Sequence, residues 1–302
     1  MYHILPFSGL YFFIIIFGFI IFLHLFKNIL NKIISFKMIL FIAIIIYIYF
    51  CIPHSEKILF FLIYVYGVYW IYVKNKYQST LLPMIIIALP MILHKFDVSP
   101  IFKVIGISYI TFRTIQAMVD SHNYGKLSFI EFTSFLLFPT TLLAGPIDRS
   151  YRFQEDLQKG YENLTFTNIG KGWDILLVGV LFKFIFAECV NKFWLIPIDE
   201  NSVHLLDMMN SAYSYTTYLF FDFAGYSAMA VGLSIMMGIT VPMNFNHPYL
   251  APNPQDFWRR FHITLGSWLT DYFFKPLYKY LHNFNILKGK RLLIQNLAII
   301  AT

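Results

Sequence analysis

The 302-residue sequence has little charge and almost no cysteine. Only 13% of its residues are Asp, Glu, Lys or Arg, whereas an ordinary soluble domain carries roughly 25%. This composition argues against a soluble globular domain with a charged surface. The two cysteines, Cys51 and Cys189, lie in or beside apolar segments without the spacing of metal ligands. They therefore predict neither a disulfide framework nor a metal site.

Lys, Arg, Asp and Glu are absent altogether from long apolar runs in the first third of the chain. The uncharged runs are Met1–Phe26, Met38–Ser55, Ile58–Val73 and Tyr77–His94. A helix needs about 20 mainly apolar residues to cross a bilayer, and in lipid every backbone polar group must be paired within the chain. A closed barrel would show alternating polar residues, and the run IIIFGFIIF does not alternate. We predict four membrane-spanning helices, at residues 7–27, 36–53, 58–73 and 80–96.

The first apolar run lacks the features of a cleaved secretion signal. No basic region precedes it and no small-residue cleavage site follows it, so it is predicted to be a retained span. Lysines lie in the loops at 27–37 and 74–77, and positively charged loops face the cytoplasm. We therefore predict a multi-pass protein of the cell membrane with its N-terminus outside. The net charge of +7 is scattered over such loops, which argues against a nucleic-acid partner.

Polar residues interrupt the apolar sequence from Ser99 onward. This pattern predicts short, kinked or re-entrant helices, because irregular backbone at membrane depth must be covered by protein or water. The polar stretch 149–172 is predicted to be an exposed loop with a short amphipathic helix, and residues 173–194 to lie partly in the membrane interface. We find no repeat or linker, so we expect one all-α multi-pass bundle over residues 1–302. It would combine N-terminal spans (1–97) with a core (98–302).

The segment DFWRRFHITLGSWLTDYFF, residues 256–274, concentrates charge in an otherwise apolar chain. Asn253 suits a helix N-cap, Pro254 suits the first helical position, and Pro276 limits the other end, so one helix of about 20 residues is predicted. Helical spacing would then place four side chains on one polar face and four on a neighbouring face. The first set is Arg260, Thr264, Ser267 and Asp271; the second is Trp258, His262, Leu265 and Leu269.

Two interpretations of this helix stay open. It can be an interfacial helix with its arginines at lipid headgroups and a hydrogen-bonded histidine. Alternatively, ionisable residues in a membrane segment mark a functional site, and His262 suits proton transfer near neutral pH.

Three further segments carry polar groups among apolar ones. Asp222 is the only formal charge between residues 208 and 255, and its carboxylate must find a partner; a structural hydrogen bond to a Tyr or Ser of a neighbouring helix is favoured over a functional role. In GPIDR, Asp148 and Arg149 can pair with each other or contact a ligand. In VPMNFNHPYL, Asn244 and Asn246 suit either a pocket wall or a simple loop.

Taken in order, these segments resemble the membrane-bound O-acyltransferase family. FFDFAGYSAMAVG, VPMNFNHPYL and DFWRRFHITLGSWLTDYFF resemble the central block of that family. GISYITFRT and LLAGPIDRSYRF are closer to its D-alanyl transfer branch. The branch that O-acetylates polysaccharides shares the FWRR-x-H block but continues into a Pro-Leu-Gly-Gly turn, where this chain has FKPLYKY. The resemblance covers residues 106–274.

The resemblance implies transfer of an acyl group from a carrier thioester to a hydroxyl, in a tunnel through the membrane. His262 matches an active-site histidine of the family and is the expected catalytic residue of this chain. In the family a second histidine, in a Trp-His-Gly motif on a later helix, is usually regarded as the principal catalytic one. Arg259, Arg260, Asn244, Asn246, Asp148 and Arg149 are expected to bind substrate, and Asp222, Trp258, Ser267 and Asp271 to be structural or to line the tunnel. No bound cofactor or metal is expected. Thr270 departs from the arginine usually found before the Asp of this motif, which leaves one local ion pair unassigned.

The expected donor is a phosphopantetheine carrier thioester on the cytoplasmic side, most simply a D-alanyl carrier protein. The acceptor would be an envelope polymer such as teichoic acid or a lipid-linked precursor, with an extracytoplasmic acyltransferase as a further partner. Alternatives are an O-acetyltransferase of an envelope or exported polysaccharide, or an inactive truncated form. The family's usual Trp-His-Gly motif does not occur in the 302 residues, which predicts a C-terminally truncated chain. A transporter would show internal repeats, and we find none.

Overall fold

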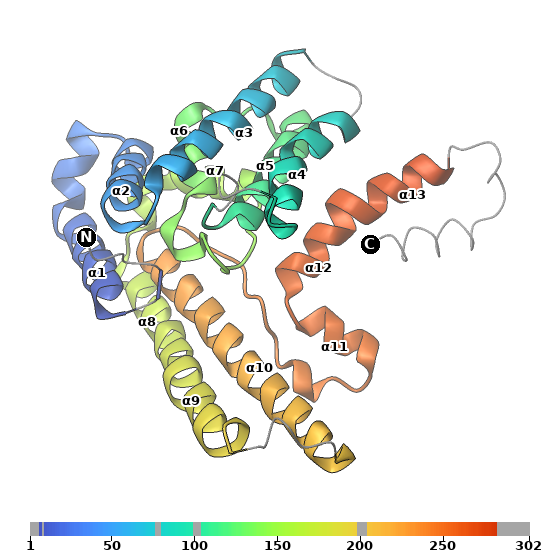
Figure 1. The fold of residues 1–302 in the computed structure, drawn as a ribbon. Coiled ribbons are helices and arrows are strands. Elements are labelled where there is room, and N and C mark those ends of the chain that lie inside the picture. The colour runs from blue at the N-terminus through green and yellow to red at the C-terminus, as the bar shows by residue number, and fades with distance from the viewer. Residues whose placement is uncertain (1–5, 8, 76–79, 99–103, 198–203, 283–302) are drawn as a thin grey trace.

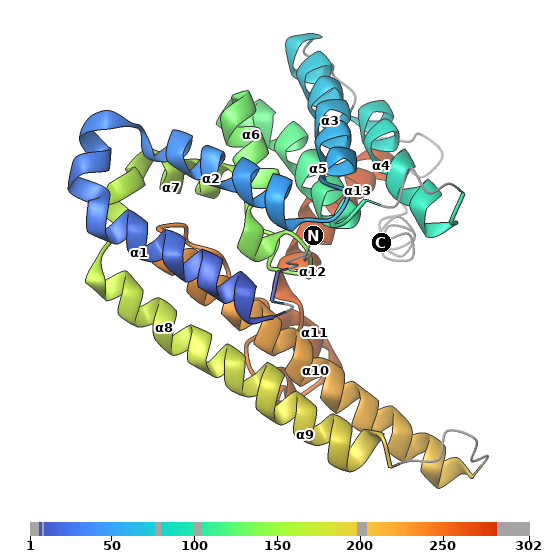
Figure 2. The same cartoon turned by 60° about the vertical axis from the view of Figure 1, so that its left-hand side comes forward.

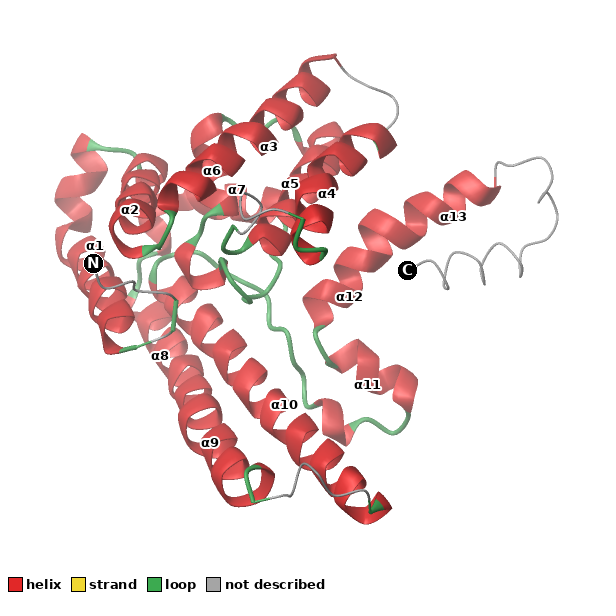
Figure 3. Cartoon of the chain, in the orientation of Figure 1, coloured by secondary structure: helices red, strands yellow, loops and turns green. Residues whose placement is uncertain are grey.

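The computed structural model describes residues 6–7, 9–75, 80–98, 104–197 and 204–282, and in these ranges the chain is helical without strands (Figure 3). The main helices are α1 (Leu10–Ile33), α2 (Phe36–Cys51), α3 (Ser55–Asn75), α4 (Leu81–Lys95), α5 (Ile107–Tyr124), α6 (Phe129–Leu136), α7 (Ser150–Lys159), α8 (Phe166–Val180), α9 (Glu188–Val190), α10 (Leu205–Met236), α11 (Pro254–Arg260), α12 (Ile263–Leu269) and α13 (Lys275–His282). Short 3₁₀ turns join some of them. π-Helical turns at Leu181–Ala187, Asn191–Leu195 and Thr270–Phe274 continue others. The all-helical prediction is confirmed for the described residues.

The helices form two groups that meet where the loops before α7 and after α10 lie (Figures 1 and 2). In one group α8 and α9 run beside α10 as a long hairpin. In the other, α2 to α7 pack together, and one apolar core extends from them to residues of α1, α10 and α12. The C-terminal helices α11 to α13 pass from the α10 side to the α5 side, so they connect the two groups (Figure 1).

The predicted N-terminal spans correspond to α1 to α4, with ends that differ by up to six residues. Three described helices are long and apolar enough to cross a membrane: α1, α3 and α10. Helices α2 and α4 are apolar but have only 16 and 15 residues. At 1.5 Å per residue they are shorter than the roughly 30 Å hydrocarbon layer. The chain is therefore a membrane protein, although only α1 and α3 of the four predicted spans have the length of a full span.

Glycines let α8 and α10 pack with their backbones almost in contact. Gly172 faces Gly232 and Gly179 faces Gly225, seven residues apart on each helix. A Cβ atom at Gly172 would lie 2.6 Å from the Gly232 carbonyl oxygen, and one at Gly225 would lie 2.7 Å from the Gly179 carbonyl oxygen. Small residues permit such close helix contacts in membranes. Residues 173–194 form one side of this hairpin, and their partial position in the membrane interface stays a prediction.

A buried arginine joins α5 to the end of α6. The Arg113 side chain is 1% exposed and donates to the carbonyl oxygens of Phe135 (3.0 Å), Leu136 (3.3 Å) and Thr141 (2.8 Å). The last carbonyls of a helix have no partner within the helix, and a cation there also opposes the helix dipole. Arg113 thus stabilises the turn that leads from α6 toward the GPIDR segment.

The polar stretch 149–172 is helical and only partly exposed, so the prediction of an exposed loop is corrected. It contains α7 as its amphipathic helix and begins α8. Asp156 of α7 is buried and accepts from the backbone N–H of Thr240 (2.6 Å) and the side-chain amide of Asn163 (3.1 Å). These contacts fix the chain directly after α10, and a buried carboxylate needs such donors.

Candidate functional site

The segment 256–274 is not one continuous helix, as predicted, but is broken at Phe261 and His262. Helix α11 begins as expected, with the Asn253 side chain accepting from the Asp256 N–H (2.8 Å), but it ends at Arg260. His262 has left-handed backbone angles (φ 49°, ψ 51°) and α12 begins after it. Pro276 does not end the helix, because it is the second residue of α13. The break separates Arg260 from the predicted polar face of Thr264, Ser267 and Asp271.

The segment after α10 holds this break open from both sides. Before the break, the Asn246 N–H donates to the Arg260 carbonyl (3.0 Å). After the break, the Ile263 N–H donates to the Asn244 carbonyl (2.8 Å). These bonds supply partners for backbone groups that lose their helical partners where a helix is interrupted. The break is therefore held by the VPMNFN segment, which sequence spacing alone does not reveal.

Thr264 connects three of the sequence motifs. Its buried hydroxyl donates to the Asn244 side-chain oxygen (2.5 Å) and accepts from the Ile147 N–H of GPIDR (3.0 Å). Asn244 is also fully buried. A single hydroxyl that satisfies two partners in a buried position fixes both of them relative to α12. The sequence analysis placed Thr264 on a polar face without a role; its contacts could not be found from spacing.

His262 lies half-buried at the break. Its ring meets the edge of the Phe223 ring, with 4.8 Å between centroids and 85° between planes. Phe223 follows Asp222 on α10, so the fourth motif also reaches this point. Within the described residues, the buried Nε2 atom has no hydrogen-bond partner. Burial lowers the pKa of His262 to about 4, so the imidazole is neutral at pH 7 and can accept a proton.

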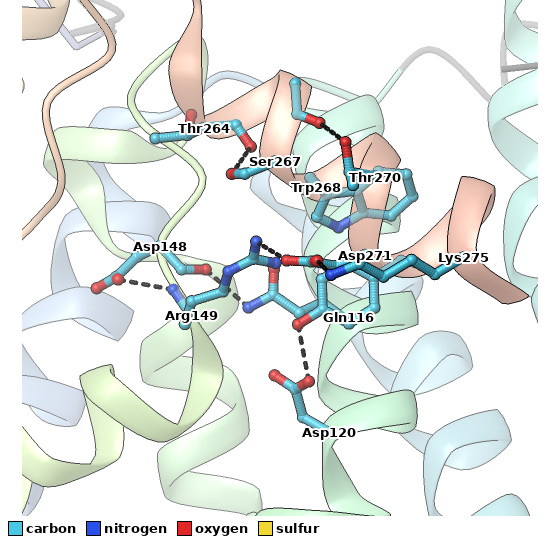
Figure 4. Close-up of polar contacts among 12 residues, drawn as sticks. Gln116, Asp120, Asp148, Arg149, Thr264, Ser267, Trp268, Thr270, Asp271 and Lys275 are labelled. Carbon is cyan, nitrogen blue, oxygen red and sulfur yellow. Dashed lines mark hydrogen bonds and ion pairs between the residues drawn. The ribbon is translucent and has the colours of Figure 1, made fainter. Parts of the chain in front are cut away.

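Asp148 and Arg149 do not pair through their side chains but serve separate networks (Figure 4). The Asp148 carboxylate is buried, accepts from its neighbour's N–H (2.6 Å) and forms an ion pair with Arg152. Its carbonyl accepts from Gln116 of α5 (2.8 Å). Burial raises the pKa of Asp148 to about 6, and the Arg152 guanidinium partly offsets that rise. Arg152 and Gln116 were not singled out from the sequence.

The Arg149 guanidinium ties the GPIDR segment to the C-terminal helices. It forms an ion pair with Asp271 (2.5 Å) and lies 5.0 Å from the centre of the Tyr272 ring. Lys275 is a second partner of Asp271 (2.7 Å), as Figure 4 shows. Asp271 therefore has two basic partners, although the residue before it, Thr270, is uncharged. Thr270 instead donates to the Gly266 carbonyl (2.8 Å).

The Asp120 carboxylate and two hydroxyl groups form a buried hydrogen-bond network near this ion pair. Asp120 of α5 accepts from the Tyr272 hydroxyl (2.7 Å) and from the Ser150 hydroxyl (2.7 Å). The Trp268 ring nitrogen also reaches the Phe112 carbonyl on α5 (3.2 Å). Helix α12 and the turn after it are thus anchored to α5 by side chains more than 140 residues away in sequence. Such pairs leave no periodic signal, which is why the sequence did not predict them.

A family model for the membrane-bound O-acyltransferase family matches residues 32–288. The chain belongs to that family. The matched range contains all four motifs that meet at the break, so the geometry above is that of an O-acyltransferase family member.

The relatives of this O-acyltransferase family member are named for two kinds of activity, D-alanyl transfer and O-acetyl transfer. Teichoic acid D-alanyltransferase of Bacillus subtilis (strain 168) is 39% identical over 181 residues, which are 56% of this chain and 44% of that protein. The protein of the same name from Streptococcus thermophilus is 32% identical over 245 residues, 74% of this chain and 59% of that protein. Peptidoglycan O-acetyltransferase of Helicobacter pylori is 36% identical over 151 residues, which are 49% of this chain and 29% of that protein. The chain spans about half the length of the first two relatives.

The remaining predicted site residues lie around the break in this family member, with different exposures. Arg260 pairs with Asp256 (2.8 Å) on α11, whereas the Arg259 side chain is exposed and has no ion pair within the described ranges. The Asn246 side chain is exposed, and the residue contacts the break through its backbone N–H. Trp258 is 66% exposed, and the exposed Ser267 donates to the Thr264 carbonyl (3.0 Å).

Asp222 has an ionic partner rather than the Tyr or Ser hydrogen bond we expected. Its carboxylate pairs with Lys183 across the α8–α10 hairpin. Both side chains are partly buried, and Lys183 lies in the π-helical turn that follows α8. The structural role favoured from the sequence stays a prediction, now with Lys183 as partner.

Replacing Asp222 with Asn should lower stability without removing the chemistry. The change leaves the Lys183 ammonium without its counter-ion, at a cost of about 1–3 kcal/mol for the unmatched group. We expect a lower melting temperature in detergent and near-normal transfer per folded molecule. The double variant Asp222→Asn with Lys183→Met should recover part of the stability. Loss of transfer at normal yield and melting temperature would instead assign Asp222 to the reaction.

Proposed function

We propose that this protein is an acyltransferase that moves an acyl group, in the first place D-alanyl, from a carrier-protein thioester to a hydroxyl of an envelope polymer such as teichoic acid. The observation that carries the proposal is the meeting of four separate motifs at His262. A half-buried imidazole at the helix break, whose Nε2 has no hydrogen-bond partner among the described residues, can act as a proton acceptor. The choice of D-alanyl as acyl group and of teichoic acid as acceptor class follows the names of the D-alanyltransferase relatives.

His262 would act as the general base of the transfer. Its Nε2 would accept the proton of the acceptor hydroxyl as the oxygen attacks the thioester carbonyl carbon. The new C–O ester bond would form, the C–S bond would break, and the leaving thiolate would take up the proton held on Nε2, which regenerates the neutral imidazole. A hydroxyl is a weak nucleophile, so removal of its proton is the step that needs help. Exclusion of water by the half-buried site would limit wasteful hydrolysis of the thioester.

The substrate-binding residues divide into two kinds in this proposal. Asp148 and Arg149 are engaged in ion pairs with Arg152 and Asp271, so they would shape the site rather than bind substrate directly. Arg259 is exposed on α11 and is the group we propose for an anionic donor or acceptor. Both a pantetheine phosphate and a teichoic acid are negative, and charge-assisted contacts suit them.

Replacing Arg259 with Gln should weaken substrate binding more than the chemical step. The loss of one charge-assisted contact, about 1.5–3 kcal/mol, predicts a KM roughly tenfold or more higher with kcat little changed. Lys171→Gln, an exposed basic residue on α8, is the matched control and should leave KM unchanged. An unaltered KM in Arg259→Gln would remove Arg259 from the binding site.

Transfer of acetate to an envelope or exported polysaccharide is the second candidate. It is supported by the peptidoglycan O-acetyltransferase above and by alginate O-acetylase relatives at 32–33% identity, over about three fifths of this chain. The same base would serve both reactions. The two differ in the acyl group, because an alanyl group carries an ammonium and an acetyl group does not.

The acyl group can be tested with the whole chain reconstituted in lipid vesicles. We expect release of labelled D-alanine from its carrier thioester to a polyglycerol-phosphate acceptor, and no comparable transfer from an acetyl thioester. Transfer of acetate alone would establish the second candidate. Transfer from neither donor to any hydroxyl acceptor would contradict the proposed activity.

We further propose that residues 1–302 form one multi-pass domain of the cell membrane with the N-terminus outside. The three long apolar helices and the lysines at residues 27–37 support this orientation. The carrier protein would then approach from the cytoplasmic side, and an extracytoplasmic acyltransferase from the other. In the structure most of residues 27–37 belong to α1 and α2, and the connection between these helices is residues 34–35. A tag inserted in that connection should be protected from protease added to intact cells. Cleavage there from outside would reverse the orientation.

A further inference from the structure

The turn at His262 is held by backbone hydrogen bonds, by ring contacts and by a nearby buried hydroxyl. Two backbone bonds pair residues 244 and 246 with the chain on either side of the break. Ring contacts pack His262 against Phe223 and Phe261 against Phe245. A side-chain hydrogen bond is added by the Thr264 hydroxyl, which binds Asn244 and Ile147 together. The hydroxyl lies two residues from the imidazole and is itself buried.

The backbone conformation of His262 makes such support necessary. A residue other than glycine with φ near +50° is in a sparsely populated region and persists only where its surroundings determine it. An uninterrupted helix through residues 261–263 would be the local alternative, because the sequence satisfies helical spacing. The paired segment 244–246 opposes that alternative, and the Asn244 side chain is held in place by Thr264.

We propose that Thr264 is a positioning residue for His262. Its hydroxyl forms hydrogen bonds with the Asn244 side chain and the Ile147 N–H. These bonds maintain the interruption between α11 and α12 and so fix the direction of the imidazole. Only the expected effect on acyl transfer rests on the proposed function of His262. The structural part, that Thr264 controls the placement of the ring, is independent of the reaction.

Three variants of the chain separate the hydroxyl from general packing. Thr264→Val keeps the shape and removes the hydroxyl, whereas Thr264→Ser keeps the hydroxyl. Thr270→Val is the matched control, because Thr270 lies one turn and a half further along and only donates to the Gly266 carbonyl of its own helix. If Thr264→Val does not reach native yield, Thr264→Ala removes the hydroxyl without a second branch.

The first measurement is the rate at which diethyl pyrocarbonate modifies His262, followed by peptide mass spectrometry with exposed His54 as internal reference. The buried Nε2 predicts slow modification in the wild type. We expect Thr264→Val to raise the rate several-fold at an unchanged reference rate. Thr264→Ser and Thr270→Val should behave as the wild type.

The second measurement is transfer in vesicles. A shift of a reacting group by about 1 Å can lower a rate by about 10²-fold, so kcat should fall by that order in Thr264→Val with KM little changed. Thr264→Ser should restore it. If His262 reactivity changes as expected while even the wild type transfers nothing, the positioning role of Thr264 is supported and the proposed function fails. Wild-type reactivity of His262 in both Thr264→Val and Thr264→Ala would overturn the positioning role of Thr264.

Discussion

Replacing His262 with Asn is expected to lower the rate of acyl transfer by about 10²–10⁴-fold, the range typical of a lost general base. Asn is the informative substitution because it tolerates the left-handed conformation of this position, whereas Ala does not do so readily. Transfer per folded molecule, measured in vesicles at saturating donor, gives the effect on kcat. The melting temperature should stay close to that of the wild type.

The same substitution elsewhere controls for the loss of a histidine. His54 also has a left-handed conformation (φ 54°) and lies exposed in the turn between α2 and α3. His54→Asn should therefore transfer at the wild-type rate. Transfer by His262→Asn at a rate within a few-fold of wild type would show that this imidazole does not accept the proton.

Replacing Gly179 with Leu is expected to prevent the α8–α10 hairpin from forming. A Cβ atom there would lie 2.6 Å from the Met229 side chain, 2.7 Å from the Met229 nitrogen and 2.8 Å from the Gly225 carbonyl oxygen. Two of these three atoms belong to the backbone, so the helices must separate. Even Gly179→Ala should cost about 1–3 kcal/mol, as overpacking does. Thermal unfolding in detergent, followed by the loss of the monodisperse species, measures both variants.

Gly170 on the same helix provides the matched control. No atom lies within 4 Å of a Cβ placed there. Gly170→Ala should be neutral or stabilising by roughly 0.5–1 kcal/mol, because glycine is a poor helix residue. Equal melting temperatures for Gly179→Ala and Gly170→Ala would mean that the helices do not pack through their glycines.

The parts of this architecture that depend on local composition could be predicted from the sequence. Uncharged apolar runs place α1 to α4, and the Asn253–Pro254 pair correctly marks the start of α11. Both signals act within one helix or one turn, where burial in lipid and capping dominate. The resemblance to the O-acyltransferase family, carried by the order of the motifs, is confirmed by the family match.

The break at His262 could not be predicted, because the helical period continues through it. What interrupts the helix is the backbone of residues 244–246, which is close only in the folded chain. The partners of Asp222 and Arg149 were missed for the same reason, since Lys183 and Asp271 lie 39 and 122 residues away. Long-range ion pairs follow from how helices pack, and spacing along one helix does not contain that information.

The most direct test of the central claim is the content of base-labile esters in the cell envelope, with D-alanine and acetate separated. Cells lacking the gene would be compared with cells that regain it as wild type or as His262→Asn. We predict that D-alanyl esters disappear on deletion, return with the wild type and stay absent with His262→Asn at equal protein level. Full recovery of the esters by His262→Asn, or unchanged esters on deletion, would contradict a transfer reaction centred on this histidine.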